Sequence, residues 1–113
     1  MLGLDGAVAG MDRKGLDFYL FVEEGTGQDS VLYRPGPRRY RLAQVRPDPH
    51  RRWNSPVPLT FYRHPAPHLT MESAIDRLEL SGSPFVFFAS FGDHRGRVLY
   101  RRPGGGYGLL PSG

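Results

Sequence analysis

The sequence predicts an α+β protein that contains two copies of one small unit, and two observations carry this prediction. Aromatic and aliphatic runs of strand length, such as residues 85–91, are separated by turn clusters rich in glycine and proline. The same runs recur after an offset of 67 residues. We therefore expect two repeats, each a helix followed by an antiparallel meander of three to four strands, packed together as an intrachain pseudo-dimer.

The repeat is visible when the sequence is aligned on itself without a gap. Residues 15–21 lie over residues 82–88, and Val-Leu-Tyr-Arg at 31–34 lies over an identical segment at 98–101. Aromatic, glycine and strand positions agree in a single register, which indicates a duplicated unit. Tyr40 and Leu42 likewise match Tyr107 and Leu109.

The first strand of each repeat is apolar on both faces. In residues 85–91, Phe85 and Phe87 point to one side, whereas Val86 and Phe88 point to the other. One helix covers only one face of a sheet, and a unit of about fifty residues buries too little surface to be stable alone. We therefore expect the repeats to pair through their sheets. The residues expected at this interface are Phe18, Leu20, Tyr33, Phe85, Phe87, Val98 and Tyr100.

A helix is expected at the start of each repeat. Leu4, Val8 and Met11 form an apolar stripe at helical spacing in residues 4–14. The second helix begins after Thr70, a favourable N-cap, and ends at Gly82. Its expected buried stripe consists of Met71, Ile75 and Leu78.

The expected boundaries are repeat one at residues 1–46, a linker at 47–56 and repeat two at 57–113. The linker region is rich in proline and arginine, which favours an extended and stiff conformation. Residues 59–63 alternate as a strand that leads into repeat two. No equivalent strand is expected in repeat one.

Positive charge is concentrated in the middle of the chain. The net charge is +4, and residues 34–63 contain eight arginines and one acid, Asp48. One interpretation is contact with RNA phosphates, with Tyr40 and Trp53 available for stacking. The other is a solvated basic linker in which Trp53 is anchored on the core. The candidate RNA-binding or ribosome-binding residues are Arg38, Arg39, Arg41, Arg46, Arg51 and Arg52.

The sequence gives little support to catalysis, metal binding or membrane insertion. The serines lie in no nucleophile motif, and Glu23 and Glu24 would point to opposite faces of a strand. His64 and His68 are separated by two prolines, which exclude a helical ligand pair. We expect no enzyme activity, cofactor or metal. The absence of cysteine and of a long apolar run fits a cytoplasmic protein without a membrane segment.

The second repeat resembles a known family. The helix ESAIDRLELSG, the aromatic strand after it, the strand VLYRR and the ending GGYGL are similar to the C-terminal domain of long-form hibernation promoting factors, also called sigma-54 modulation proteins. The first repeat is a degenerate copy of the same pattern. The resemblance implies a non-enzymatic, ribosome-associated module that pairs with a second copy of itself.

The expected function is therefore ribosome binding during translational silencing. The expected partner is the small ribosomal subunit, through rRNA or a ribosomal protein, and no membrane is involved. A stand-alone RNA-binding or regulatory adaptor of the same fold is the alternative. Because both copies lie on one chain, we expect a monomer whose repeats pair with each other.

Overall fold

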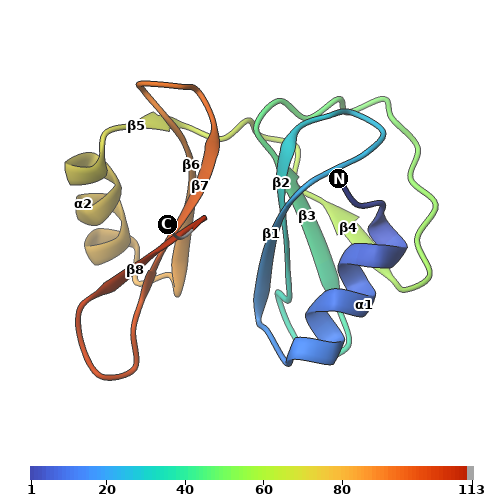
Figure 1. Ribbon diagram of the computed structural model, residues 1–113, viewed down its shortest axis with the longest axis horizontal. Coiled ribbons are helices and arrows are strands. Elements are labelled where there is room, and N and C mark those ends of the chain that lie inside the picture. Colours follow the sequence, from blue (N-terminus) through green and yellow to red (C-terminus); the bar gives the residue numbers. More distant parts are fainter. Residues whose placement is uncertain (112–113) are drawn as a thin grey trace. The chain divides into compact units, whose positions relative to one another are not determined.

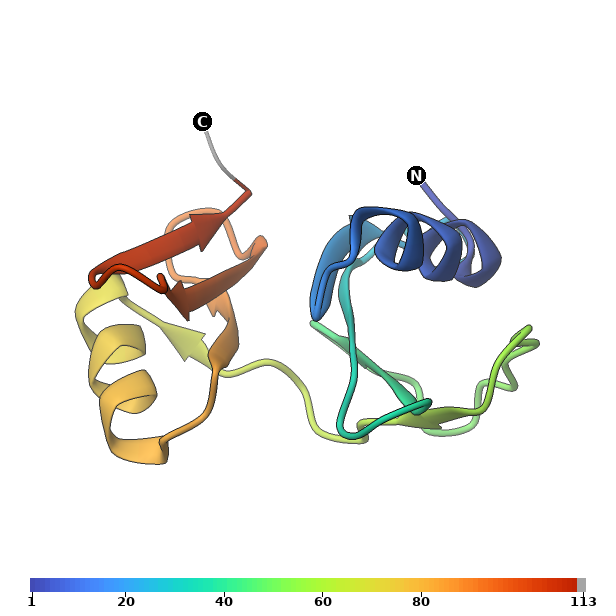
Figure 2. The ribbon, with the colours of Figure 1, turned by 90° about the horizontal axis from the view of Figure 1, so that it is seen from below.

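The computed structural model describes residues 1–111 and divides the chain into two compact units, Met1–Pro65 and the residues from Ala66 onward. Each unit is a helix packed on one face of a four-stranded mixed sheet (Figures 1 and 2). The predicted α+β class and the duplicated helix-and-strand unit are confirmed.

The first unit contains helix α1 (Leu4–Lys14) and strands β1 (Phe18–Val22), β2 (Asp29–Tyr33), β3 (Tyr40–Gln44) and β4 (Leu59–Phe61). The first three strands form an antiparallel meander. The fourth strand, β4, is added parallel to β3 at the edge of the sheet.

The second unit contains β5 (His68–Leu69), helix α2 (Met71–Ser81), β6 (Phe85–Ser90), β7 (Gly96–Arg101) and β8 (Tyr107–Leu110). Again three strands form an antiparallel meander, and the short strand β5 pairs parallel to β6. The additional parallel strand therefore lies beside the last meander strand in the first sheet and beside the first one in the second sheet.

The elements that the two units share keep the 67-residue offset. The pair Phe18–Tyr33 in the first sheet corresponds to Phe85–Tyr100 in the second. Both helices end at a glycine in the left-handed region, Gly15 with φ 64° and Gly82 with φ 67°. A residue with a Cβ atom is disfavoured there, which explains why both stop signals are glycine.

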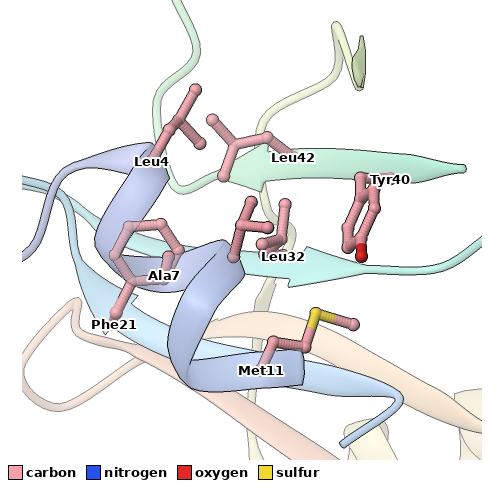
Figure 3. Packing of buried hydrophobic residues seen from close by; sticks show 8 residues of the cluster. Leu4, Ala7, Met11, Phe21, Leu32, Tyr40 and Leu42 are labelled. Atoms are coloured by element: carbon pink, nitrogen blue, oxygen red, sulfur yellow. The ribbon is translucent and has the colours of Figure 1, made fainter. Parts of the chain in front are cut away.

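Each helix packs its apolar stripe against its own sheet. In the first unit Leu4, Val8 and Met11 are all buried, as predicted, and Figure 3 shows the α1 side chains facing those of the strands. In the second unit Ala74 and Leu78 are fully buried on the sheet. The clusters are completed by Ala7, Phe21, Leu32, Tyr40 and Leu42 in the first unit and by Val86, Phe88 and Leu99 in the second.

The strand expected to lead into the second repeat belongs instead to the first sheet. As β4, Leu59 pairs with Tyr40 and Phe61 pairs with Leu42. Leu59 and Phe61 also pack against the core of the first unit, and this burial explains their position. The division between the units consequently falls after Pro65, whereas we expected repeat two to begin at residue 57.

The first unit does have a counterpart of β5, contrary to the expectation from the sequence. Leu2 forms a parallel bridge with Glu23. This bridge is the exact 67-residue equivalent of the pair Leu69–Ser90. It is missed in the sequence because a single bridge carries no strand periodicity.

The expected linker is partly folded onto the first unit. The Trp53 ring stacks on Phe61 with 5.4 Å between ring centroids, and Trp53 and Val57 pack against the α1 core. The packing of Trp53 on the core, one part of the second interpretation, is therefore observed, and contact of the arginines with RNA stays a prediction. The connection from β4 to β5 is shorter than expected and comprises residues 62–67.

Met71 of the expected buried stripe is exposed, and so is Phe91 at the end of the apolar strand expected over residues 85–91. Met71 is 41% exposed, whereas its counterpart Leu4 is 6% exposed. The first unit buries Leu4 in the core against which the 53–61 segment packs, and the second unit has no equivalent segment among the described residues. Phe91 lies beyond the end of β6, in the turn, and is 59% exposed.

Candidate binding surfaces

The sheet face opposite the helix carries every residue predicted at the interface between the repeats. In the first sheet Tyr19 and Phe21 pack on the α1 side. Because side chains alternate along a strand, Phe18 and Leu20 point to the opposite side, and Tyr33, which pairs with Phe18, shares that face.

The second sheet repeats this arrangement. Val86 and Phe88 pack against α2, so Phe85 and Phe87 point away from it. Val98 and Tyr100, their partners on β7, complete the same face. Each unit thus presents an aromatic and aliphatic sheet face on the side away from its helix, here called the helix-free face.

The two helix-free faces differ most in charge at the position of Arg41 and its counterpart Gly108. A Cβ atom added to Gly108 would overlap the ring of Tyr100, so the tyrosine ring lies directly over this glycine. The counterpart of Gly108 is Arg41, whose guanidinium lies 6.0 Å from the centre of the Tyr33 ring. Arg41 Nε also donates a hydrogen bond to Thr60 Oγ1 at 3.0 Å. Arg41 is therefore placed on a sheet face, apart from the other arginines of the expected cluster.

The remaining arginines of the expected cluster lie at two opposite ends of the first unit. Arg38 and Arg39 are exposed in the loop before β3, and Arg38 has a positive φ of 60°. Arg34 lies in the same loop and forms an ion pair with Asp12 in the last turn of α1. We call this end, with residues Arg13, Lys14, Arg34, Arg38 and Arg39, the β2–β3 end.

Arg46, Arg51 and Arg52 lie at the other end, beside the turn between β1 and β2. The Arg46 backbone N–H donates to Gln28 Oε1 at 2.7 Å. Arg51 lies over the Trp53 ring at 4.5 Å, and Arg51 and Arg52 line a shallow hollow with the start of α1. We call this the β1–β2 end.

Acidic residues distinguish the two ends. The hollow at the β1–β2 end also contains Asp5, Glu23 and Glu24, which offset its arginines. Glu23 is buried, and its carboxylate accepts hydrogen bonds from the backbone N–H groups of Gly25 and Thr26 at 2.7 and 2.8 Å. At the β2–β3 end the nearby carboxylates are those of Asp12 and Asp17.

The β2–β3 end keeps uncompensated positive charge. In the described part of the chain no ion pair engages Arg38 or Arg39, and Lys14 lies over the Tyr19 ring at 5.4 Å. This end therefore carries more net positive charge than the β1–β2 end.

A hydrogen-bonded group that the sequence reading missed lies next to these arginines. Tyr40 donates its phenol to Asp12 Oδ1 at 2.8 Å. This hydrogen bond and burial raise the pKa of Tyr40 above its ordinary value. The 67-residue offset could have revealed the group, because Asp12, Arg34 and Tyr40 match Glu79, Arg101 and Tyr107.

The counterpart group is present in the second unit. Tyr107 donates a hydrogen bond to the Glu79 carboxylate, which lowers the pKa of Glu79 and raises that of Tyr107. Arg101 pairs with the same carboxylate at 3.4 Å.

The histidines expected to lack a metal role are dispersed among aromatic contacts. His64 packs edge-on against Tyr62, and His68 packs edge-on against His94 at 5.3 Å. Within residues 1–111, no group of three or more His, Cys, Asp or Glu side chains is placed to hold a metal ion. The helices that the structure describes are also too short and too polar to cross a membrane.

The structure is a duplicated α+β unit with an apolar sheet face in each copy and a basic end on the first. The family model described as "Sigma 54 modulation/S30EA ribosomal protein C terminus" matches residues 2–42 and 62–109, one stretch in each repeat. The chain belongs to this family, as the resemblance of its sequence predicted.

Two relatives are similar over most of the chain. Both are named "Dormancy associated translation inhibitor", from Mycobacterium tuberculosis strains CDC 1551 / Oshkosh and ATCC 25618 / H37Rv. Each is 41% identical over 115 residues, which cover 95% of this chain and 42% of the relative. The chain therefore spans less than half the length of these relatives.

Proposed function

We propose that this chain is a ribosome-binding module of a cytoplasmic, non-enzymatic protein that silences translation. The main support is that both repeats match a family whose description names a ribosomal protein. The two relatives, which are named as translation inhibitors, also support the proposal. The proposed binding site on the ribosome is the small subunit. The chain contributes two surfaces to this function, the helix-free faces and the basic β2–β3 end.

The helix-free faces pair with each other within one chain. Apolar residues such as Leu20 and Phe87 need a cover that the helix of their own unit does not provide, because it lies on the other side of the sheet. The six residues between β4 and β5 reach about 20 Å when extended. A tether of this length gives the partner sheet an effective concentration in the millimolar range, about that of short flexible linkers.

Pairing within the chain has a functional consequence. The sheet face that would otherwise join two chains is then used internally, so the module holds single ribosomes and does not join two. The interface residues of this proposal are those expected from the sequence, with Val31 and Ala43 on the same face of the first sheet.

The β2–β3 end contacts rRNA phosphates. Arg38 and Arg39 are exposed, lie next to each other and have no ion pair in the described structure. The guanidinium group matches phosphate oxygens in a bidentate manner, and Arg13 and Lys14 add charge nearby. The arginines of the β1–β2 end are opposed by carboxylates and contribute less.

Co-sedimentation with ribosomes over a salt titration tests this assignment with two matched variants. Arg38→Ala/Arg39→Ala and Arg51→Ala/Arg52→Ala each remove two charges. The first variant is expected to weaken binding and to reduce the slope of log K against log salt by about 1.4–1.8, because each phosphate contact contributes about 0.7–0.9. The second is expected to have the smaller effect. Equal effects of both variants, or none, would contradict the assignment.

A stand-alone RNA-binding adaptor is the second candidate, and the exposed arginines favour it too. A gel shift with protein-free RNA of about 50 nucleotides separates the two, because a ribosome-binding module prefers assembled subunits at the same salt. Separated subunits in the sedimentation assay identify which one is bound.

A further inference from the structure

The two sheets differ at the outer edge of their last meander strand. In the first unit the outer edge of β3 is occupied by β4. In the second unit β8 is the edge strand, and the described residues place no strand beyond it. The positions are equivalent, because Tyr40 and Leu42 on β3 match Tyr107 and Leu109 on β8 at the 67-residue offset.

The helix flank next to this edge differs in the same way. In the first unit Trp53, Val57, Leu59 and Phe61 pack against the cluster that contains Leu4 and Val8, both 6% exposed. Their counterparts in the second unit are Met71, which is 41% exposed, and Ile75, which is partly exposed. Within the described residues, the second unit thus has the surface that the 51–61 segment covers in the first unit, and no segment covers it there.

We propose that this surface binds an extended, basic and aromatic segment of another protein. We call the surface the β8 slot and define it by Met71, Glu72, Ile75 and the outer edge of β8. The proposal rests on the internal comparison of the two units and does not depend on ribosome binding.

The first unit indicates how the backbone of the bound segment would pair with β8. There Leu42 C=O accepts a hydrogen bond from the N–H of Tyr62 at 2.9 Å, and β4 runs parallel to β3. The equivalent acceptor in the β8 slot is Leu109 C=O. Addition of an extended strand to an exposed sheet edge is a recurrent mode of peptide recognition, in which alternate side chains give specificity.

The charge of the occupant follows from the helix. In the first unit Asp5 lines the same hollow as Arg51 and Arg52, which precede Trp53. The counterpart of Asp5 is Glu72, which is exposed and forms no ion pair within the described residues. A segment that is basic before its aromatic residue therefore complements the β8 slot.

The segment 51–61 of the chain itself is not the occupant. It is already docked in the first unit, where Trp53 stacks on Phe61 and both pack on the α1 core. Its transfer to the β8 slot of a second copy would expose the surface that it covers, so exchange gains no net burial.

A peptide with the sequence of residues 50–62 is the probe, because it carries the pattern that fits the equivalent surface. The full chain is titrated into the labelled peptide, and anisotropy reports binding. We expect saturable binding in the micromolar range and amide shifts at residues 107–110. Met71→Lys is expected to weaken binding about tenfold or more, because it places a cation in the slot against a basic peptide.

Leu80→Lys is the matched control. Leu80 lies on the same helix, is 88% exposed and corresponds to Arg13, which is exposed outside the packed cluster of the first unit. This variant is expected to bind the peptide like the unchanged chain. Thermal melts show whether both variants are folded.

Several outcomes of the peptide titration overturn the proposal. They are the absence of saturable binding, equal affinity of the Met71→Lys variant, and amide shifts at residues 40–42 instead of 107–110. A concentration-dependent dimer that the peptide dissociates would assign the slot to a second copy and would likewise overturn it.

Discussion

Tyr40 and Asp12 tie the third strand of the first sheet to the end of its helix. The phenol donates to Asp12 Oδ1 at 2.8 Å, and Arg34 from the end of β2 pairs with the same oxygen. The Arg34 guanidinium also lies 5.1 Å from the centre of the Tyr40 ring. One carboxylate thus connects the last turn of α1 to two strands.

The second unit retains this connection with an equivalent tyrosine and arginine, and a glutamate takes the place of the aspartate. Tyr107 and Arg101 meet the Glu79 carboxylate, and Arg101 Nη2 also donates to the Leu78 carbonyl at 3.1 Å. Aspartate in one copy and glutamate in the other indicate that the charge and the hydrogen bond matter more than the length of the side chain.

Tyr40→Phe is expected to destabilise the protein by about 0.5–1.5 kcal/mol, the typical net contribution of one hydrogen bond. Burial of the ring is retained, so only the hydrogen bond is removed. Urea unfolding at neutral pH measures the difference. Tyr62→Phe is the control, because this tyrosine is 42% exposed and its ring contact with His64 does not need the hydroxyl. An equal loss in both variants would contradict the role of the Tyr40–Asp12 bond.

The Glu79–Tyr107 pair is expected to make stability depend on pH. The hydrogen bond from Tyr107 lowers the pKa of Glu79 in the folded state below its ordinary value of 4.5, so this stabilisation is present above pH 4.5 and is lost as pH falls through the folded pKa. The pKa of Tyr107 is raised, so its contribution is present below its ordinary value of 10.0 and is lost as pH rises through the higher folded pKa.

Urea unfolding of the unchanged chain and of Glu79→Gln between pH 7 and pH 3 tests the acidic limb. The stability difference between the two proteins is expected to shrink as the pH falls. In a Tyr107→Phe background the pH dependence of this difference should be much weaker. A difference that stays constant with pH would show that the carboxylate does not act through its charge.

The repeat unit and its register could be predicted from the sequence because aromatic and glycine positions recur at one offset. The pairs Phe18–Tyr33 and Phe85–Tyr100 follow from that offset and the turn positions. Strand β4 could not be assigned correctly, because residues 59–61 show strand periodicity but nothing local that specifies which sheet they join. Packing on the α1 core decides it.

The arginine cluster shows a second limit of sequence reading. Arg39 and Arg46 are close in sequence, but strand β3 lies between them and separates them by about 17 Å for its five residues. Proximity along a strand is therefore not proximity in space. The exposure of Met71 had no signal in the second helix itself, because the segment that buries its counterpart belongs to the first unit only.

Phe88→Ala is expected to destabilise the protein by about 3–5 kcal/mol, as large-to-small changes in cores do. Phe88 is 1% exposed and packs between α2 and the sheet. Thermal melting is the measurement. The neighbouring Phe91, 59% exposed, provides the matched control, and Phe91→Ala should leave the melting temperature nearly unchanged. A small shift for Phe88→Ala would mean that the α2 core can collapse into the space.

A double-mutant cycle between Leu20→Ala and Phe87→Ala tests whether the helix-free faces pair. These residues occupy equivalent positions, and in a two-fold arrangement equivalent residues near the axis meet. The expected coupling energy is about 0.5–3 kcal/mol, as for residues in contact. The cycle between Leu20→Ala and Phe88→Ala is the control, because Phe88 faces α2, and it should be additive. Additivity in both cycles would argue against pairing through these faces.

The last prediction concerns the oligomeric state, which tests the proposal that the module holds single ribosomes. Pairing of the two sheets within one chain competes with pairing between chains, and a six-residue tether favours the former at any protein concentration below about 1 mM. Light scattering at micromolar concentration should therefore give the mass of one chain, 12.7 kDa. Leu20→Asp/Phe87→Asp should keep this mass and lower the melting temperature, because the faces lose their apolar match. A stable dimer of the unchanged chain that these substitutions convert to monomer would show that the faces join two chains, and joining of two ribosomes would then be the better assignment.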